Sequence, residues 1–123
     1  MRYVLALTLG AVCLSSLQAV AHHSLSIYDR SVSKTIEGTV REFEWTNPHA
    51  KLILMVPATD GTTKRWYFEG GGVRRLSDRG FKQDAIVLGE KIMVAYNPMR
   101  DGSSSGFFIG IKTADGKTYG SMR

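Results

Sequence analysis

Three histidines, His22, His23 and His49, are the residues of this chain best suited to coordinate a metal ion. Neutral imidazole suits copper, zinc and nickel, and copper(II) prefers nitrogen and oxygen donors in a tetragonal arrangement. His22 follows Ala19-Val20-Ala21, the small-residue pattern at which export signals are cut. Cleavage after Ala21 would free the α-amine of His22. That residue would then offer both its amine and its ring nitrogen to one ion.

The histidine placement predicts a copper site as one hypothesis. His22 would chelate the ion through its amine and ring, and His49 would supply a remote nitrogen. His23 could replace either residue as a ligand, or it could orient the ligands without binding the metal itself. The arrangement requires residues 22–33 to fold back onto the loop that holds His49. Taken singly, each histidine also fits a plainer role, as part of a loose chain end or as a turn residue.

Residues 1–21 have the features of a cleavable export signal. Arg2 gives a positive start, an apolar stretch follows, and small residues precede the cut. The stretch is too short for a stable transmembrane span, so no membrane span is expected after processing. Cys13, the only cysteine, would be removed with the signal. The expected location is the periplasm.

The charge of the chain is mildly basic. Sixteen lysines and arginines face 11 acidic residues, for a formal net charge of +5, which falls by one if Arg2 is removed. Such an excess is common and does not define a ligand. No nucleic-acid partner is expected in the periplasm, and the partners we expect are a periplasmic protein or a cell-envelope ligand.

The elements that must position these side chains follow from hydrophobic alternation. Residues 22–33 are polar without periodicity and are expected to form an N-terminal arm, and residues 34–123 a single β domain. The apolar parity changes between Val40 and Phe43, which predicts a bulge. Asp60-Gly61 predicts a hairpin turn. We expect strands over 35–45, 50–56, 64–69, 90–96, 107–113 and near 117–119, with a short helix over 73–79.

Three strands, a short helix and then further strands is the order of an OB-like Greek-key barrel with five to six strands. An open β-sandwich of the same strands is the competing architecture. An OB-like barrel favours a second hypothesis, a non-enzymatic binding module. Its candidate ligand-binding residues are Trp45, Asn47, Arg65 and Tyr67. Most other large aromatic residues are expected to fill the core.

No motif of this chain indicates catalysis. Gly70-Gly71-Gly72 with Arg74 and Arg75 is compatible with an anion site at a helix start, but a strand-to-helix turn with solvated arginines explains it better. The glutamates on the predicted strands show no pairing typical of two catalytic carboxylates. There is no serine or cysteine nucleophile motif. We therefore expect a protein that is not an enzyme.

Several motifs together resemble a known family. They are His22-His23-Ser24 after the signal, Glu44-Trp45-Thr46-Asn47-Pro48-His49, Trp66-Tyr67-Phe68-Glu69-Gly70-Gly71, Arg79-Gly80-Phe81 and Leu88-Gly89-Glu90. The chain is similar over essentially all of its mature length to domain-of-unknown-function family 6152, a group of small exported bacterial proteins. The resemblance implies a periplasmic location and a compact β domain. It implies no established activity.

Overall fold

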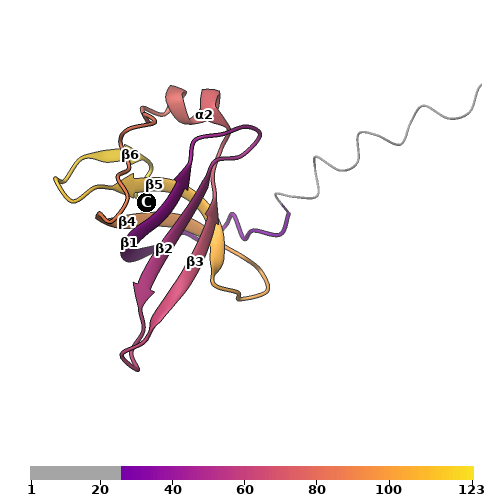
Figure 1. Cartoon of the computed structure of the whole chain (residues 1–123). Coiled ribbons are helices and arrows are strands. Elements are labelled where there is room, and N and C mark those ends of the chain that lie inside the picture. The colour runs from indigo at the N-terminus through magenta and orange to yellow at the C-terminus, as the bar shows by residue number, and fades with distance from the viewer. Residues whose placement is uncertain (1–25) are drawn as a thin grey trace, which may run out of the picture.

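The computed structural model describes residues 26–123, which form six β-strands and one short α-helix (Figure 1). The helix separates the first three strands from the last three, as the alternation and turn residues predict. In chain order the elements are β1 (Lys34–Glu44), β2 (Lys51–Pro57), β3 (Thr63–Glu69), α2 (Val73–Asp78), β4 (Lys91–Pro98), β5 (Ser105–Lys112) and β6 (Thr118–Gly120).

The first five of these strands close into a barrel. β1 pairs antiparallel with β2 and β4, β2 with β3, and β4 with β5. A short parallel pairing between β3 and β5, from Tyr67↔Ser105 to Glu69↔Phe107, completes the ring, and β6 adds to the outer edge of β5. This strand order is that of the OB-type barrel. The predicted fold class is confirmed, and the alternative of an open sandwich is wrong.

β1 is the longest strand and serves two neighbours. Its first half pairs with β4 and its second half with β2. The register with β2 shifts between Val40 and Glu42, where the apolar parity of the sequence changes. A bulge of this kind adds one residue to a strand, bends it and increases its twist. The predicted bulge is confirmed, and it lets β1 curve from one side of the barrel to the other.

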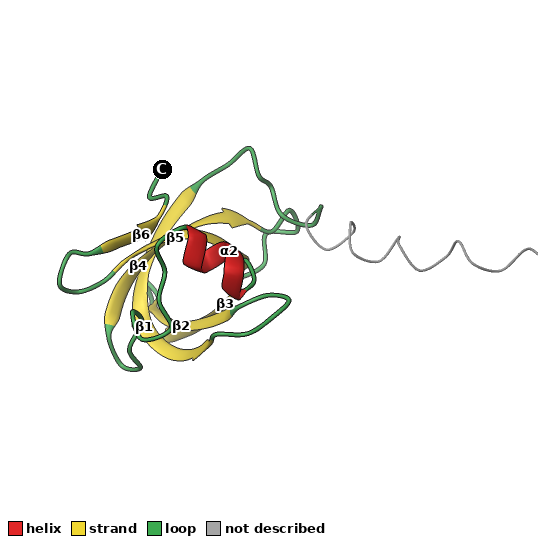
Figure 2. Cartoon of the chain, turned by 90° about the horizontal axis from the view of Figure 1, so that it is seen from above, coloured by secondary structure: helices red, strands yellow, loops and turns green. Residues whose placement is uncertain are grey.

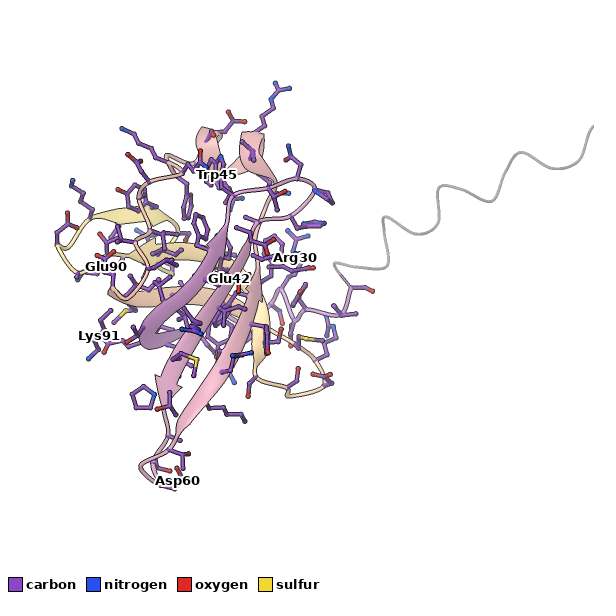
Figure 3. All side chains as sticks on the ribbon, viewed as in Figure 1. Arg30, Glu42, Trp45, Asp60, Glu90 and Lys91 are labelled. Atoms are coloured by element: carbon purple, nitrogen blue, oxygen red, sulfur yellow. The ribbon has the colours of Figure 1, made fainter. Side chains whose placement is uncertain are left out.

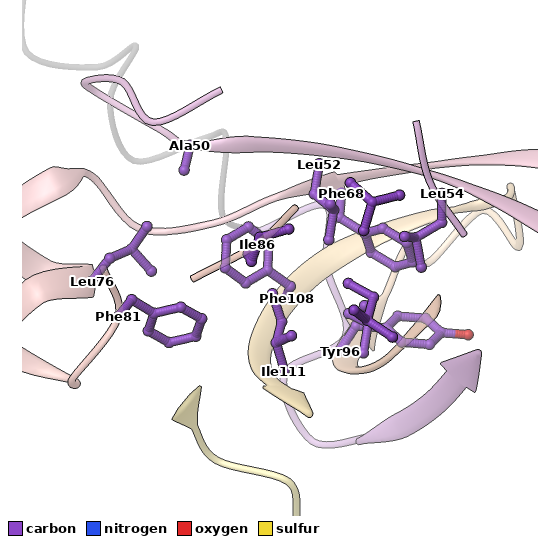
Figure 4. Packing of buried hydrophobic residues seen from close by; sticks show 13 residues of the cluster. Ala50, Leu52, Leu54, Phe68, Leu76, Phe81, Ile86, Tyr96, Phe108 and Ile111 are labelled. Atoms are coloured by element: carbon purple, nitrogen blue, oxygen red, sulfur yellow. The ribbon is translucent and has the colours of Figure 1, made fainter. Parts of the chain in front are cut away.

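Each of the five barrel strands contributes apolar side chains to one core (Figure 4). The alternation seen in the sequence is the cause, because successive side chains of a strand point to opposite faces. Phe108, at 1 % exposure, is the largest side chain of the fully buried group. The strand residues of the core are Val40, Leu52, Leu54, Phe68, Ile92, Val94, Tyr96, Phe108 and Ile111.

The helix α2 covers one end of the barrel (Figure 2). Its buried residue Leu76 is only 3 % exposed and joins Phe81 and Ile86 in closing that end of the core. Burying a leucine side chain of this kind contributes about 2 kcal/mol. The Phe81 ring lies 6.0 Å from the ring of Phe108, measured between centroids. This contact ties the segment after α2 to the barrel interior.

The described part of the N-terminal arm, residues 26–33, packs on the barrel beside the loop between β4 and β5. Asp29 donates its backbone N–H to the Pro98 carbonyl at 2.8 Å, and Arg100 donates to the Ile27 carbonyl at 2.9 Å. Tyr28 forms an isolated bridge with Met99 and is only 3 % exposed. The arm therefore has an anchored segment although its sequence lacks periodicity. Residues 1–25, with His22, His23 and the signal pattern, lie outside the described residues.

Candidate functional site

The loop between β1 and β2, residues 45–50, packs against the glycine run that follows β3. Gly70 donates its backbone N–H to the Ala50 carbonyl at 2.8 Å, and Ala50 donates to the Gly71 carbonyl at 3.2 Å. Two of the motifs that carry the family resemblance therefore meet in space, at the barrel end that α2 covers. Residues 45–50 also supply side-chain contacts across this junction, from Asn47 and His49.

His49 is half-buried at this junction, and its ring Nδ1 lies 3.1 Å from the Gly70 carbonyl oxygen. A carbonyl oxygen can only accept a hydrogen bond, so Nδ1 must carry the proton. In a neutral ring, Nε2 then keeps its lone pair. Metal-binding histidines are commonly oriented by such a bond from the nitrogen that does not bind the metal. The geometry leaves His49 with one nitrogen that is able to bind a metal ion.

Asn47 caps the helix α2 from a distant part of the chain. Its Oδ1 accepts a 2.9 Å hydrogen bond from the backbone N–H of Val73, the first residue of α2. The residue before the helix, Gly72, has no side chain to do this. A Cβ on Gly72 would lie 2.7 Å from Asn47 Oδ1, so the close approach of the loop requires a glycine there. The amide oxygen of Asn47 thus has a structural partner.

Gly70 is needed for a different reason. A Cβ at this position would overlap the ring of Phe108 in the core. The glycine run therefore lets the chain pass close to both the core ring and the Asn47 loop. This supports the interpretation of the run as a strand-to-helix turn, with Arg74 and Arg75 exposed on the helix.

The outer face of β1, β2 and β3 carries a groove, which we call the outer groove. Cross-strand pairing sets Glu42 opposite Ile53 and Ile53 opposite Tyr67, with Glu44, Lys51 and Glu69 as the next row. The groove has a volume of about 420 Å³. It is lined by Tyr28, Glu42, Glu44, Lys51, Leu52, Ile53, Tyr67, Phe68, Glu69 and Ser105.

The charges of the outer groove differ in sign from those of the chain as a whole. Three glutamates and one lysine line it, whereas the chain has a formal net charge of +5. Lys51 Nζ lies 3.4 Å from Glu44 Oε2, an exposed pair. The Arg65 side chain, just beyond the groove, donates from Nη1 to the Tyr67 hydroxyl at 3.4 Å. This contact raises the pKa of Arg65 and holds the two side chains together.

Tyr28 joins the N-terminal arm to the end of β3. Its hydroxyl donates a 2.9 Å hydrogen bond to Glu69 Oε2, and its ring lies 5.6 Å from that of Phe107. Burial of the phenol, together with the bond to the Glu69 carboxylate, raises the pKa of Tyr28 well above its ordinary value. The hydroxyl thus stays protonated at any physiological pH, and one oxygen of Glu69 has a permanent donor.

A family model described as a family of unknown function, DUF6152, matches residues 10–108. The chain belongs to this family. The resemblance seen in the motifs is thereby confirmed. No curated protein sequence matches the chain. Among solved structures, the chain is similar to the N-terminal domain of PriB from Thermoanaerobacter tencongensis, with a TM-score of 0.49 and 17 % identity over 69 % of this chain and 98 % of that one.

The four predicted ligand-binding residues of this DUF6152 chain lie in two different places. Tyr67 is 49 % exposed in the outer groove, and Arg65 is exposed beside it. Asn47 is at the helix junction. Trp45 lies at the same end of the barrel, near α2, where it is half-buried and packs beside Phe43 with ring centroids 6.2 Å apart (Figure 3). The structure brings together Arg65 with Tyr67, and Asn47 with His49, but not all four.

Sequence reasoning missed most of the outer groove. Glu42, Ile53 and Glu69 face one another only through the pairing of three strands, and Tyr28 comes from an arm with no periodicity. The available signal was the outward parity of Tyr67 on β3, because its register partners on β2 share that face. Strand register is needed before such a set can be recognised.

The predicted metal site lies partly outside the described residues. Within residues 26–123, no three His, Cys, Asp or Glu side chains are grouped so that they could hold a metal ion. His49 is the only one of the three predicted ligands in this range, with its Nδ1 3.1 Å from the Gly70 carbonyl oxygen. The same part of the chain also has no helix of the length and apolar character needed to cross a membrane.

Proposed function

We propose that this DUF6152 protein is an exported, non-catalytic binding module that holds an extended basic peptide in the outer groove. The observation that carries the proposal is the position of Tyr67. The residue is 49 % exposed beside the half-buried Ile53, in a groove lined by three glutamates. Large aromatic side chains normally bury their rings, so an exposed ring in a groove favours a binding role.

The chemistry of the groove favours a cationic ligand. Glu42 and Glu69 have no lysine or arginine within ion-pair distance in residues 26–123, although Arg65 lies near enough for Glu42 to help raise its pKa, and Glu44 is paired with Lys51. A lysine or arginine side chain could therefore contact a carboxylate and the face of Tyr67 together, since aromatic faces attract cations. Nucleic-acid phosphates would be repelled by the same carboxylates. Ile53 and the exposed ring offer apolar contact to the rest of a peptide.

Export to the periplasm is part of this proposal. Its support is the sequence alone: a positive start, an apolar stretch and the Ala19-Val20-Ala21 pattern. Mass spectrometry of the protein recovered from the periplasm would give the mature N-terminus. Cleavage after Ala21 is expected, and a retained signal would contradict it.

Peptide binding can be tested with the processed protein and labelled tripeptides. We expect fluorescence anisotropy to show binding of Lys-Trp-Lys and much weaker binding of Glu-Trp-Glu. Glu42→Gln and Tyr67→Ala should each weaken Lys-Trp-Lys binding roughly three- to tenfold. Glu37→Gln is the matched control, because Glu37 is also an exposed β1 glutamate but lies outside the groove and contacts Lys91 at 3.7 Å. Equal binding of both peptides, or an equal loss in the control, would contradict the proposal.

Copper(II) binding is a second candidate function, favoured by the orientation of His49. The Gly70 carbonyl accepts a hydrogen bond from Nδ1–H of His49, so the lone pair of Nε2 is left to bind a metal ion. Tyr28 contacts Glu69, the neighbour of Gly70, and His22 lies six residues before Tyr28. A chain of that length spans up to about 20 Å, which is enough for His22 to approach the ring. We propose His22 and His49 as the ligands, with His23 as a substitute or support.

The copper hypothesis has its own experiment. Protein that begins at His22 is titrated with copper(II) against a competing chelator, and electron paramagnetic resonance reports the nitrogen ligands. His49→Asn keeps a side-chain donor for the Gly70 carbonyl but removes the ligand nitrogen. We expect it, and the addition of one residue ahead of His22, to weaken binding at least tenfold. Affinity that survives both changes would rule out this site.

A further inference from the structure

A small pocket next to the N-terminal arm is lined by three arginines. We call it the arginine pocket. It has a volume of about 40 Å³ and lies apart from the outer groove, with which it shares only Tyr28. Figure 3 labels Arg30, which belongs to the arm beside the barrel strands. The lining residues are Tyr28, Arg30, Arg75, Arg79, Asn97, Phe107 and Ile109.

The three arginines come from two segments that are far apart in the sequence. Arg30 belongs to the arm, whereas Arg75 lies in the last turn of α2 and Arg79 directly follows that helix. Cations near a helix C-terminus are favourable, which accounts for the positions of Arg75 and Arg79 without any ligand. It does not account for Arg30, which the arm brings to the same pocket. Arg30, Arg75 and Arg79 are exposed, so solvent screens part of their mutual repulsion, and a bound anion would offset the rest.

No acidic side chain of residues 26–123 forms an ion pair with these arginines. Asp29, next to Arg30 in the chain, accepts hydrogen bonds from the Ser31 hydroxyl and backbone at 2.6 and 3.1 Å and lies 3.9 Å from Arg100. Glu69 accepts a hydrogen bond from the Tyr28 hydroxyl. Asp29 and Glu69 are therefore committed elsewhere, and Asp78, which precedes Arg79 in the chain, forms no ion pair with it.

The guanidinium groups are the charged donors of the pocket. Asn97 donates its side-chain amide to the Val32 carbonyl at 2.8 Å, and the Tyr28 hydroxyl is bound to Glu69. Phe107 and Ile109 provide half-buried apolar surface. An apolar wall lowers the local dielectric, which strengthens the attraction between guanidinium and an anion.

We infer that the arginine pocket binds a phosphate group. Guanidinium is planar and donates pairs of parallel hydrogen bonds, a geometry that matches phosphate oxygens. Three cations suit a group with up to two negative charges better than they suit a single carboxylate. A volume of about 40 Å³ admits one such group but not a whole nucleotide. Inorganic phosphate and the phosphate of a lipid headgroup offer the same chemistry.

The test compares two double variants of the processed protein. In Arg75→Gln/Arg79→Gln two pocket cations are removed. In Arg74→Gln/Lys82→Gln, the matched control, two exposed cations of the same region that do not line the pocket are removed. Both are titrated with inorganic phosphate at low ionic strength by NMR. Both are also sedimented with vesicles of phosphatidylglycerol or of phosphatidylcholine. Thermal unfolding shows that each variant is folded.

We expect the pocket variant to bind at least tenfold more weakly than the wild type, and the control less than twofold more weakly. Arg30→Gln should weaken binding as well, although it leaves α2 unchanged. Binding of inorganic phosphate that follows this pattern supports a soluble source. The same pattern with phosphatidylglycerol vesicles alone supports a lipid headgroup. Failure of both probes to bind, or an equal loss in the control variant, overturns the inference. Neither result bears on peptide binding in the outer groove.

Discussion

The side-chain oxygen of Asn47 accepts a 2.9 Å hydrogen bond from the backbone N–H of Val73, and so the loop between β1 and β2 caps the helix α2. A helix start leaves backbone donors without partners, and a capping side chain satisfies one of them. Here the cap comes from the Trp45-Thr46-Asn47-Pro48-His49 motif rather than from the residue before the helix. Part of this distinctive motif is thus explained by packing.

Replacing Asn47 tests this role. Asn47→Ala should lower the free energy of unfolding by about 1 kcal/mol, as loss of a helix cap typically does. Asn47→Asp keeps an acceptor oxygen and should stay close to the wild type. Urea denaturation of both variants measures the difference. The capping account would be contradicted if the alanine variant were as stable as the aspartate one.

The close contact between Gly70 and Phe108 gives a second prediction. A Cβ at position 70 would overlap the Phe108 ring, so Gly70→Ala should destabilise the protein by about 2–3 kcal/mol. Gly71→Ala is the control, because the atoms nearest to its new Cβ belong to the Arg75 side chain, at 3.0 Å or more, and not to a core ring. Adding Phe108→Leu to Gly70→Ala should recover part of the loss. Strictly additive effects in thermal unfolding would show that the two sites do not contact each other.

The raised pKa of Tyr28 predicts that the free energy of unfolding falls at alkaline pH. Its pKa is raised in the folded protein by burial and by the hydrogen bond to Glu69. The stabilisation is complete below the ordinary tyrosine pKa of about 10. It is lost as the pH rises further, because the unfolded chain then ionises while the folded one keeps its proton. Burial also raises the pKa of Tyr96, which adds to the same trend.

Tyr28→Phe should therefore flatten the decline in stability between about pH 10 and 11, by up to about 1.4 kcal/mol per pH unit for one proton. Urea denaturation at several pH values gives the slope. The variant should also be less stable than the wild type at neutral pH, since it lacks the bond to Glu69. An unchanged slope would show that the Tyr28 proton is not held more tightly in the folded state.

The barrel was predictable because apolar and polar residues alternate along much of its strands. Trp66 and Phe68 face inward and Tyr67 outward, as their parity indicates, and the change of parity after Val40 marks the bulge. Local rules such as alternation and turn residues were enough for these features. The parallel contact between β3 and β5, which closes the barrel, joins residues far apart in the sequence and left no local signal.

The site was harder to predict because it depends on register. Val40 pairs with Leu54, so a regular strand would place Arg41 opposite Ile53, but the bulge places Glu42 there instead. A shift of one residue moves every later side chain to the other face. The acidic character of the outer groove therefore follows from the bulge. His49 was singled out by type, yet only its distance from the Gly70 carbonyl shows which ring nitrogen is free.

The most direct test of peptide binding is to map the contact on the folded protein. Uniformly ¹⁵N-labelled processed protein is titrated with Lys-Trp-Lys, and the shifts of backbone amides are followed by NMR. We predict that the largest shifts cluster at residues 42–44, 51–53 and 67–69, which form the outer groove. They should become weaker in Tyr67→Ala. An absence of shifts, or shifts centred on another face of the barrel, would contradict the proposed function.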